Sequence, residues 1–187
     1  MMVDDDLDYT GLHAFVFMRE VDPGTNIRDV IAALRQLDKP TIRYAAEMVG
    51  TSLGFAHVRT DTLAEMHDLI AGELWERGVH CDHCLEKGVA KQGNRLIGAK
   101  RSTPEIIALS RVRTRRGAAD DVLAAMADEH GPLRDTFRGA STVFGDFDIL
   151  LQLGGDSYDA VAEDAAVALQ TIEGIVATDT AFTDGRR

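Results

Sequence analysis

The feature that most constrains the fold is an internal repeat. The second half of the chain aligns with the first at a shift of 95 residues, which places Gly50 on Gly145 and Val58 on Leu153. Both halves show the same succession of strand-like alternation and helix-like spacing of apolar residues. The sequence of 187 residues therefore predicts two similar units that arose by duplication. The alternative is a pair of unrelated α+β units with a similar period.

The clearest strand pair in the repeat lies around Gly145 and Asp146. Alternating and β-branched residues lead into this dipeptide, and a run of apolar residues follows it. Gly and Asp tolerate positive φ, so the pattern predicts an antiparallel hairpin with its turn at these two residues. The two strands of the hairpin are expected at Phe137–Phe144 and Phe147–Leu153.

The other strands and helices follow from the same two periodicities. The expected strands are Leu12–Glu20, Thr41–Val49, Leu53–Arg59, Val79–Glu86, Ile106–Arg113 and Ile175–Phe182. Helices are expected over 27–37, 62–78, 117–130 and 156–173. A capping box, in which Thr62 and Glu65 satisfy free backbone donors, opens the second of these helices. The apolar spacing predicts two inner helix faces, Leu63, Met66, Ile70 and Leu74 in the first half and Tyr158, Val161, Ala165, Leu169 and Ile172 in the second.

This order of elements, β-α-β-β-α-β in each half, is the ferredoxin-like arrangement of the α+β class. Both helices of such a unit lie on one face of its sheet, and the other face must be covered. We therefore expect tandem ferredoxin-like units packed sheet-to-sheet as a dimeric α/β barrel. The expected organisation is an acidic lead over 1–9, a first unit over 10–86, a basic linker over 87–104 and a second unit over 105–187.

Composition excludes several classes of partner. The formal net charge is −11, and the linker is a short segment with basic and no acidic residues. Acidic units argue against direct nucleic-acid binding, which depends on clustered Lys and Arg. No apolar run approaches the roughly 18–20 residues that span a bilayer, and the acidic N-terminus is unlike a signal peptide. The chain is expected to be cytoplasmic, with no membrane partner.

The segment from His80 to Cys84 is a candidate zinc site, because Cys and His are the usual zinc ligands. The segment is expected to be a strand, however, and Cys81 and Cys84 would then project to opposite faces. A strand with two thiols is therefore the preferred interpretation, with metal binding as the alternative. No metal ligand and no cofactor is assigned.

The second half resembles the effector-binding domain of the Lrp/AsnC family of transcription regulators, from Ile107 to Phe182. The hairpin T-V-F-G-D-F-D-I-L-L-Q-L and the later E-G-I-V carry the resemblance. It implies a dimeric α/β barrel that binds small effectors, commonly amino acids, near the hairpin. The first half keeps Gly50 but has Thr51 and Leu53 where the second has acids. The residues before the first strand leave no room for the helix-turn-helix of such regulators, so a stand-alone sensing domain is expected.

Four residues are candidate ligand contacts: Gly145, Asp146, Asp148 and His57. The two acids would lie on one face of a strand, where they could accept hydrogen bonds from a ligand's ammonium group. Their alternative roles are structural, in the turn and at the sheet edge. His57 is a ligand contact or an acid/base group if it points inward, and otherwise a core histidine. The alternation of Arg111, Arg113, Arg115 and Arg116 could hold a carboxylate or form a salt-bridged sheet end.

The preferred hypothesis is a regulatory module that binds a small-molecule effector, forms a homo-oligomer and has no catalytic residues. The alternative is a dimeric α/β barrel enzyme, such as a cofactor-free monooxygenase or a haem or tetrapyrrole enzyme. His57, His13 and Tyr44 would then be the groups to examine. Perturbed pKa values in a histidine-lined cavity would favour the enzyme.

Overall fold

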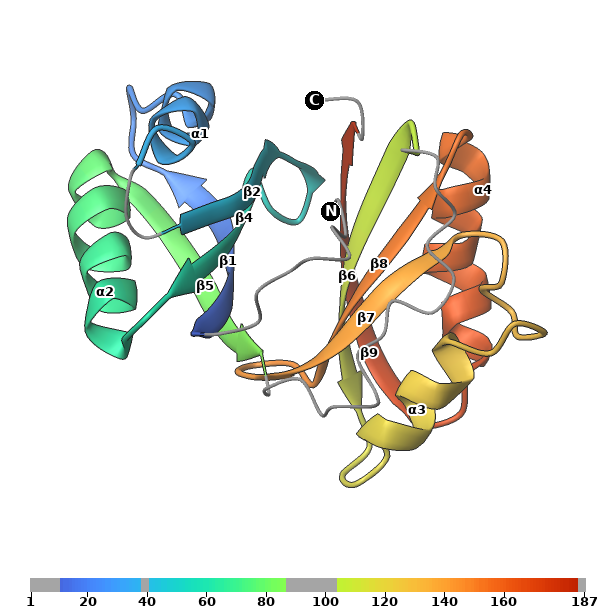
Figure 1. The fold of residues 1–187 in the computed structure, drawn as a ribbon. Coiled ribbons are helices and arrows are strands. Elements are labelled where there is room, and N and C mark those ends of the chain that lie inside the picture. The colour runs from blue at the N-terminus through green and yellow to red at the C-terminus, as the bar shows by residue number, and fades with distance from the viewer. Residues whose placement is uncertain (1–10, 38–40, 87–103, 185–187) are drawn as a thin grey trace. The chain divides into compact units, whose positions relative to one another are not determined.

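The computed structural model describes residues 11–37, 41–86 and 104–184 of the chain. The chain folds into two compact units, of which unit 1 holds the described residues up to Glu86 and unit 2 those from Pro104 (Figure 1). The expected acidic lead, and the expected basic linker except for Pro104, lie outside the described residues. Within the described part of the chain, no helix is both long and apolar enough to cross a bilayer.

Unit 1 is built on a four-stranded antiparallel sheet with strand order β2-β4-β1-β5. A two-residue strand, β3, follows β2 in the chain. The strands are β1 (Leu12–Val21), β2 (Thr41–Glu47), β3 (Val49–Gly50), β4 (Gly54–Thr60) and β5 (Val79–Glu86). Both helical segments pack on one face of this sheet, around a core that includes Val16, Val58 and Leu69 (Figure 1).

The helices of unit 1 begin at side-chain caps. Helix α1 (Ile27–Leu34) begins after Asn26, whose side chain accepts a hydrogen bond from the Arg28 amide. Helix α2 (Leu63–Asp68) begins after Thr62, whose side chain accepts from the Glu65 amide. The helix then continues as a π-helical turn (Leu69–Leu74) and a 3₁₀ turn (Trp75–Arg77).

Unit 2 repeats this plan, with strand order β9-β6-β8-β7 in an antiparallel sheet. Its strands are β6 (Ile106–Thr114), β7 (Phe137–Phe144), β8 (Ile149–Gly155) and β9 (Ile175–Asp184). Its helices are α3 (Ala119–Met126) and α4 (Tyr158–Glu163), and α4 continues as a π-helical turn (Asp164–Ala168) and a 3₁₀ turn (Leu169–Thr171). The two helices cover one face of the sheet (Figure 1).

The correspondence between the units is close at the predicted repeat shift of 95. Strand β4 maps onto β8 and helix α2 onto α4 without an offset at either end. Each second helix also leaves α-helical geometry at the same point, directly after the sixth helical residue. The α+β class and the ferredoxin-like order of both units are confirmed. Duplication as their origin, and packing of sheet against sheet, stay predictions.

The inner helix faces are confirmed except at their first residues and at Ile70. Leu63 and Tyr158 are 62% and 54% exposed, so their predicted burial is wrong. Helical side chains lean toward the N-terminus of their helix. The first residue of a helix therefore leans past the end of the helix, where no preceding turn covers it. Ile70 is only half-buried, because the π-helical turn brings Leu69 into the core in its place, whereas Leu74 is buried as predicted.

The junction after the 3₁₀ turn of unit 1 requires glycine. Gly78 has φ 72°, and a Cβ there would lie 2.8 Å from the Cβ of Asp22. Gly24 has φ 94° but an added Cβ would meet nothing within 4 Å. Gly78→Ala is therefore expected to cost about 2–4 kcal/mol of unfolding free energy, against about 1–2 for Gly24→Ala. Equal losses in urea denaturation of the two variants would contradict this account.

Candidate functional site

The turn between β7 and β8 holds three of the four candidate residues. Residues 145–148 form a bend, and β8 begins only at Ile149. The prediction that Asp146 and Asp148 share one face of a strand is therefore wrong. The turn is longer than the predicted two-residue turn because Phe147 and Asp148 belong to it. Phe147 is buried, whereas Gly145 and Asp146 are exposed.

Asp148 fixes this turn to the neighbouring strand β6. Its backbone amide donates a hydrogen bond to the Val112 carbonyl at 2.9 Å, and its carbonyl accepts from the Val143 amide at 2.9 Å. Its carboxylate Oδ2 accepts from the backbone amide of Thr114 at 2.7 Å and from the Thr114 hydroxyl at 3.2 Å. The structural role is the better interpretation of Asp148, because its polar groups already hold the turn in place.

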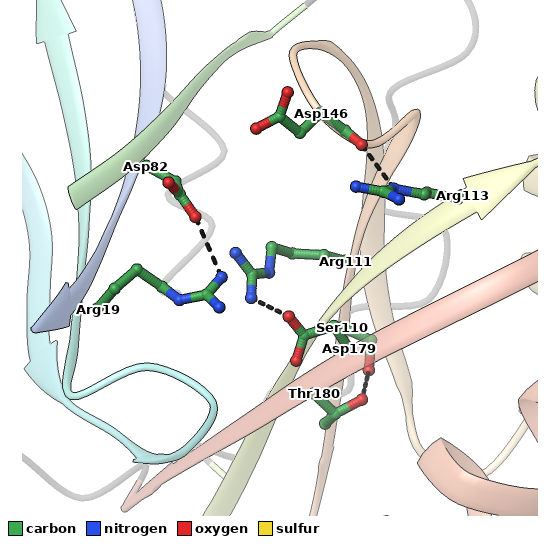
Figure 2. Close-up of polar contacts among 8 residues, drawn as sticks. All are labelled: Arg19, Asp82, Ser110, Arg111, Arg113, Asp146, Asp179 and Thr180. Carbon is green, nitrogen blue, oxygen red and sulfur yellow. Dashed lines mark hydrogen bonds and ion pairs between the residues drawn. The ribbon is translucent and has the colours of Figure 1, made fainter.

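Asp146 lies at the outer end of the same turn. The Nε of Arg113 donates a hydrogen bond to the Asp146 backbone carbonyl at 2.8 Å. Figure 2 shows the Asp146 carboxylate pointing away from that guanidinium group. The turn therefore presents an exposed carboxylate and an exposed guanidinium, on a backbone that Arg113 and Thr114 hold in position.

The alternating arginines from Arg111 to Arg116, of which Arg111 and Arg113 lie on β6, do not form one anion site. Buried Arg111 makes an ion pair with Asp179 on β9, and the Ser110 and Thr180 hydroxyls beside them are hydrogen-bonded at 2.8 Å (Figure 2). Arg115 lies 3.9 Å from the carboxylate of Glu173. The salt-bridged sheet end is therefore the interpretation that the structure favours. Unit 1 has a comparable surface pair, Arg19 with Asp82 at 3.0 Å (Figure 2).

His57, the fourth candidate, lies on β4 in unit 1 and is 5% exposed. Its Nε2 is 3.0 Å from Nδ1 of His13 on β1, so one of the two nitrogens donates to the other. Its ring also lies 4.8 Å from the ring of Phe15. Burial first, and then the adjacent His13, lower the pKa of His57 from 6.5 to about 3. His57 is therefore neutral at physiological pH.

The His13–His57 pair belongs to the sheet face of unit 1 opposite the helices. Phe55 lies on the same face, and its ring centroid is 5.2 Å from that of Phe17 and 6.1 Å from that of Tyr44. In the sequence analysis, His13 and Tyr44 were candidates only under the enzyme hypothesis. No spacing of residues along the sequence predicted that His13 and His57 would form a pair. The partners are 44 positions apart, and only the register of β1 against β4 brings them together.

The His80–Cys84 string forms part of strand β5, as predicted. Cys81 contacts the helix-side core, whereas the Cys84 thiol faces the other way and lies 3.8 Å from the Phe15 carbonyl. Burial, and then Asp82, raise the pKa of Cys81 to about 11, so this thiol stays protonated. Among the described residues, no group of three or more His, Cys, Asp or Glu side chains is arranged to hold a metal ion.

Comparison with known proteins identifies the fold. No protein-family model and no curated protein sequence matches the chain. The solved structure of the siroheme decarboxylase NirDL is similar over 94% of this chain and 71% of its own, with TM-score 0.66 and 10% identity. An anthrone oxidase-like protein is similar over 94% of both chains, with TM-score 0.53 and 11% identity. E. coli AsnC is similar over 49% of this chain and 60% of its own, with TM-score 0.38 and 20% identity. At 10% and 11% identity, the likeness to NirDL and to the anthrone oxidase-like protein is one of fold.

Proposed function

We propose that this chain is a regulatory module that binds a small zwitterionic metabolite, with free amino acids as the first class, at the β7–β8 turn. The observation that carries the proposal is the held turn of unit 2, with Asp146 and Arg113 exposed on it. The sequence resemblance to the Lrp/AsnC effector domain supports the same location. Such a module would signal by binding its ligand more tightly in one assembly state than in another.

The chemistry of the turn fits a molecule with one positive and one negative group. The Asp146 carboxylate can accept hydrogen bonds from an ammonium group, and charge-assisted bonds of this kind are the strong ones. The Arg113 Nε donates its hydrogen bond to the Asp146 carbonyl, and this bond orients the guanidinium group. The two terminal nitrogens of that group can then donate to a ligand carboxylate. Because Asp148 and Thr114 already fix the backbone, little ordering cost remains when a ligand binds.

A thermal-shift screen of free amino acids tests the proposal. A ligand at about 100 times its Kd stabilises the folded state by about 2.7 kcal/mol, which raises the Tm of a chain this size by several degrees. We expect at least one amino acid to do so in a concentration-dependent way. A complete set of amino acids without a shift would contradict the proposal.

The second candidate function is an enzyme that uses the helix-free face of unit 1. The observation in its favour is the buried His13–His57 pair, in which the imidazole of His57 lies beside Phe15 and has a strongly lowered pKa, as groups in functional sites often do. A spectral titration with haem tests whether this candidate enzyme binds a tetrapyrrole. A saturable change of the haem absorption that is lost in His57→Gln would favour a tetrapyrrole-binding enzyme over the regulatory module.

A further inference from the structure

Unit 1 contains an open groove between its second helical segment and strand β5. The groove has a volume of about 260 Å³. Its lining is mostly apolar, and two histidines are its polar members. Leu63 and Trp75, each 62% exposed, contribute to it. The lining residues are Leu63, Met66, His67, Ile70, Ala71, Trp75, His83 and Leu85.

The corresponding place in unit 2 is filled by aromatic side chains. Leu63 and Tyr158 are corresponding residues, because each is the first residue of its helix after the cap. Leu85 and Phe182 correspond as well, because they pair with Ala14 and Ala108 at the same register of the two sheets. In unit 2 these positions are filled by two aromatic rings, whose centroids are 4.9 Å apart. In unit 1 two leucines take their place.

We propose that this groove of unit 1 binds a small neutral aromatic molecule, about the size of one substituted ring. The volume of about 260 Å³ is just below the roughly 300 Å³ at which pockets for drug-sized ligands begin. The ring would pack between Leu63 and Leu85 and against the Trp75 indole, as the rings of unit 2 pack on each other. A hydroxyl or N–H on the ring would donate to an unprotonated ring nitrogen of His67 or His83.

Charge favours a neutral ligand over an aromatic acid. The groove lining includes neither Lys nor Arg, and the chain carries a formal net charge of −11. An anion would therefore approach an unfavourable field and find no cationic partner in the lining. The groove and the β7–β8 turn belong to different units, so this inference stands or falls independently of the proposed function.

The test uses p-cresol, which is the side-chain analogue of tyrosine and so reproduces the ring of Tyr158. Trp75 is the only tryptophan of the chain, so tryptophan fluorescence reports directly on the groove. Titration of the full chain with p-cresol is expected to change this fluorescence in a saturable way, with a Kd of about 1 mM or tighter for a ligand of this size. A change that stays linear with concentration would overturn the proposal.

Leu63→Tyr supplies the matched variant, because it places in unit 1 the residue that unit 2 already carries. Its ring is expected to occupy the groove and to weaken p-cresol binding by about tenfold or more. Ala64→Tyr adds the same side chain at a neighbouring, exposed position and is expected to bind p-cresol like the natural chain. If Leu63→Tyr fails to fold, Leu85→Phe fills the groove from the strand side. Unchanged binding in the folded filled variant would overturn the proposal.

A second copy of the chain is the rival occupant of the groove. If a second copy covers it, sedimentation will show an assembly that dissociates in Leu63→Tyr, and p-cresol will bind the natural chain only at dilutions at which the assembly has dissociated. That outcome would overturn the small-molecule proposal. A sedimentation profile that is the same in Leu63→Tyr and in the natural chain would support it, together with saturable p-cresol binding.

Discussion

Acidification from neutral pH is expected to destabilise the protein steeply, and His57→Gln is expected to remove much of that sensitivity. The pKa of His57 is 6.5 in the unfolded chain and about 3 in the folded protein, because the folded protein buries the ring beside His13. Between these two values the unfolded state binds one more proton than the folded state. Stability is therefore complete above the unfolded value and falls as pH decreases toward about 3.

The expected loss is roughly 1 kcal/mol per pH unit, which amounts to several kcal/mol over the window. Urea denaturation of the natural chain and of His57→Gln at a series of pH values measures it. Glutamine is the matched substitution, because Gln152 occupies the corresponding position of β8 and is likewise buried. Carboxylates titrate in both proteins, so the difference between their curves reports on the contact between His57 and His13. Parallel curves between pH 6.5 and 3 would show that the histidine is not held neutral.

Phe55→Ala is expected to be among the most destabilising single substitutions, at about 3–5 kcal/mol. Phe55 is 1% exposed, although it lies on the sheet face that the helices of unit 1 do not cover. Its ring packs against those of Phe15, Phe17 and Tyr44. Removing it would leave a cavity among aromatic side chains that cannot collapse easily, and denaturant unfolding measures the cost.

Phe144→Ala is the control, because Phe144 is also a strand residue but is 64% exposed. We expect its loss to stay below about 1 kcal/mol, as for most surface substitutions. A similar small loss for Phe55→Ala would mean that the helix-free face of unit 1 is open to water. The prediction that the two sheets pack against each other would then lose its main support, because that packing requires a buried face.

The sequence predicted the fold well because the repeat and the periodicities are local properties. Strands β5 and β7 have the predicted bounds, and the cap at Thr62 lies where the capping box predicts it. The predicted burial of Leu63 and Tyr158 was wrong because helical periodicity treats all positions of a helix alike. The side chain of a first helical residue leans past the end of its helix, where no preceding turn covers it. The π-helical turn of unit 1 changed its inner face for a similar reason, since no residue pattern predicts such a turn.

The candidate site was predictable in part. The turn signal at Gly145 and Asp146 identified the exposed turn between β7 and β8. It did not predict that Thr114, which is far away in the sequence, would donate two hydrogen bonds to the Asp148 carboxylate. The contact between His13 and His57 was likewise inaccessible, because strand register decides it. Side chains that come together across strands depend on pairing, which one-dimensional spacing does not contain.

The most direct test of a ligand site at the β7–β8 turn is a calorimetric titration of the Asp146→Asn variant. The ligand is the amino acid that most stabilises the natural chain. The substitution removes the exposed carboxylate but leaves the backbone carbonyl that Arg113 uses. We expect the affinity to fall about tenfold or more, the equivalent of one lost charge-assisted hydrogen bond. Asp159→Asn, an exposed acid in the first turn of α4, changes the net charge equally and is expected to bind normally. Equal affinities for the natural chain and both variants would contradict a ligand site at the β7–β8 turn.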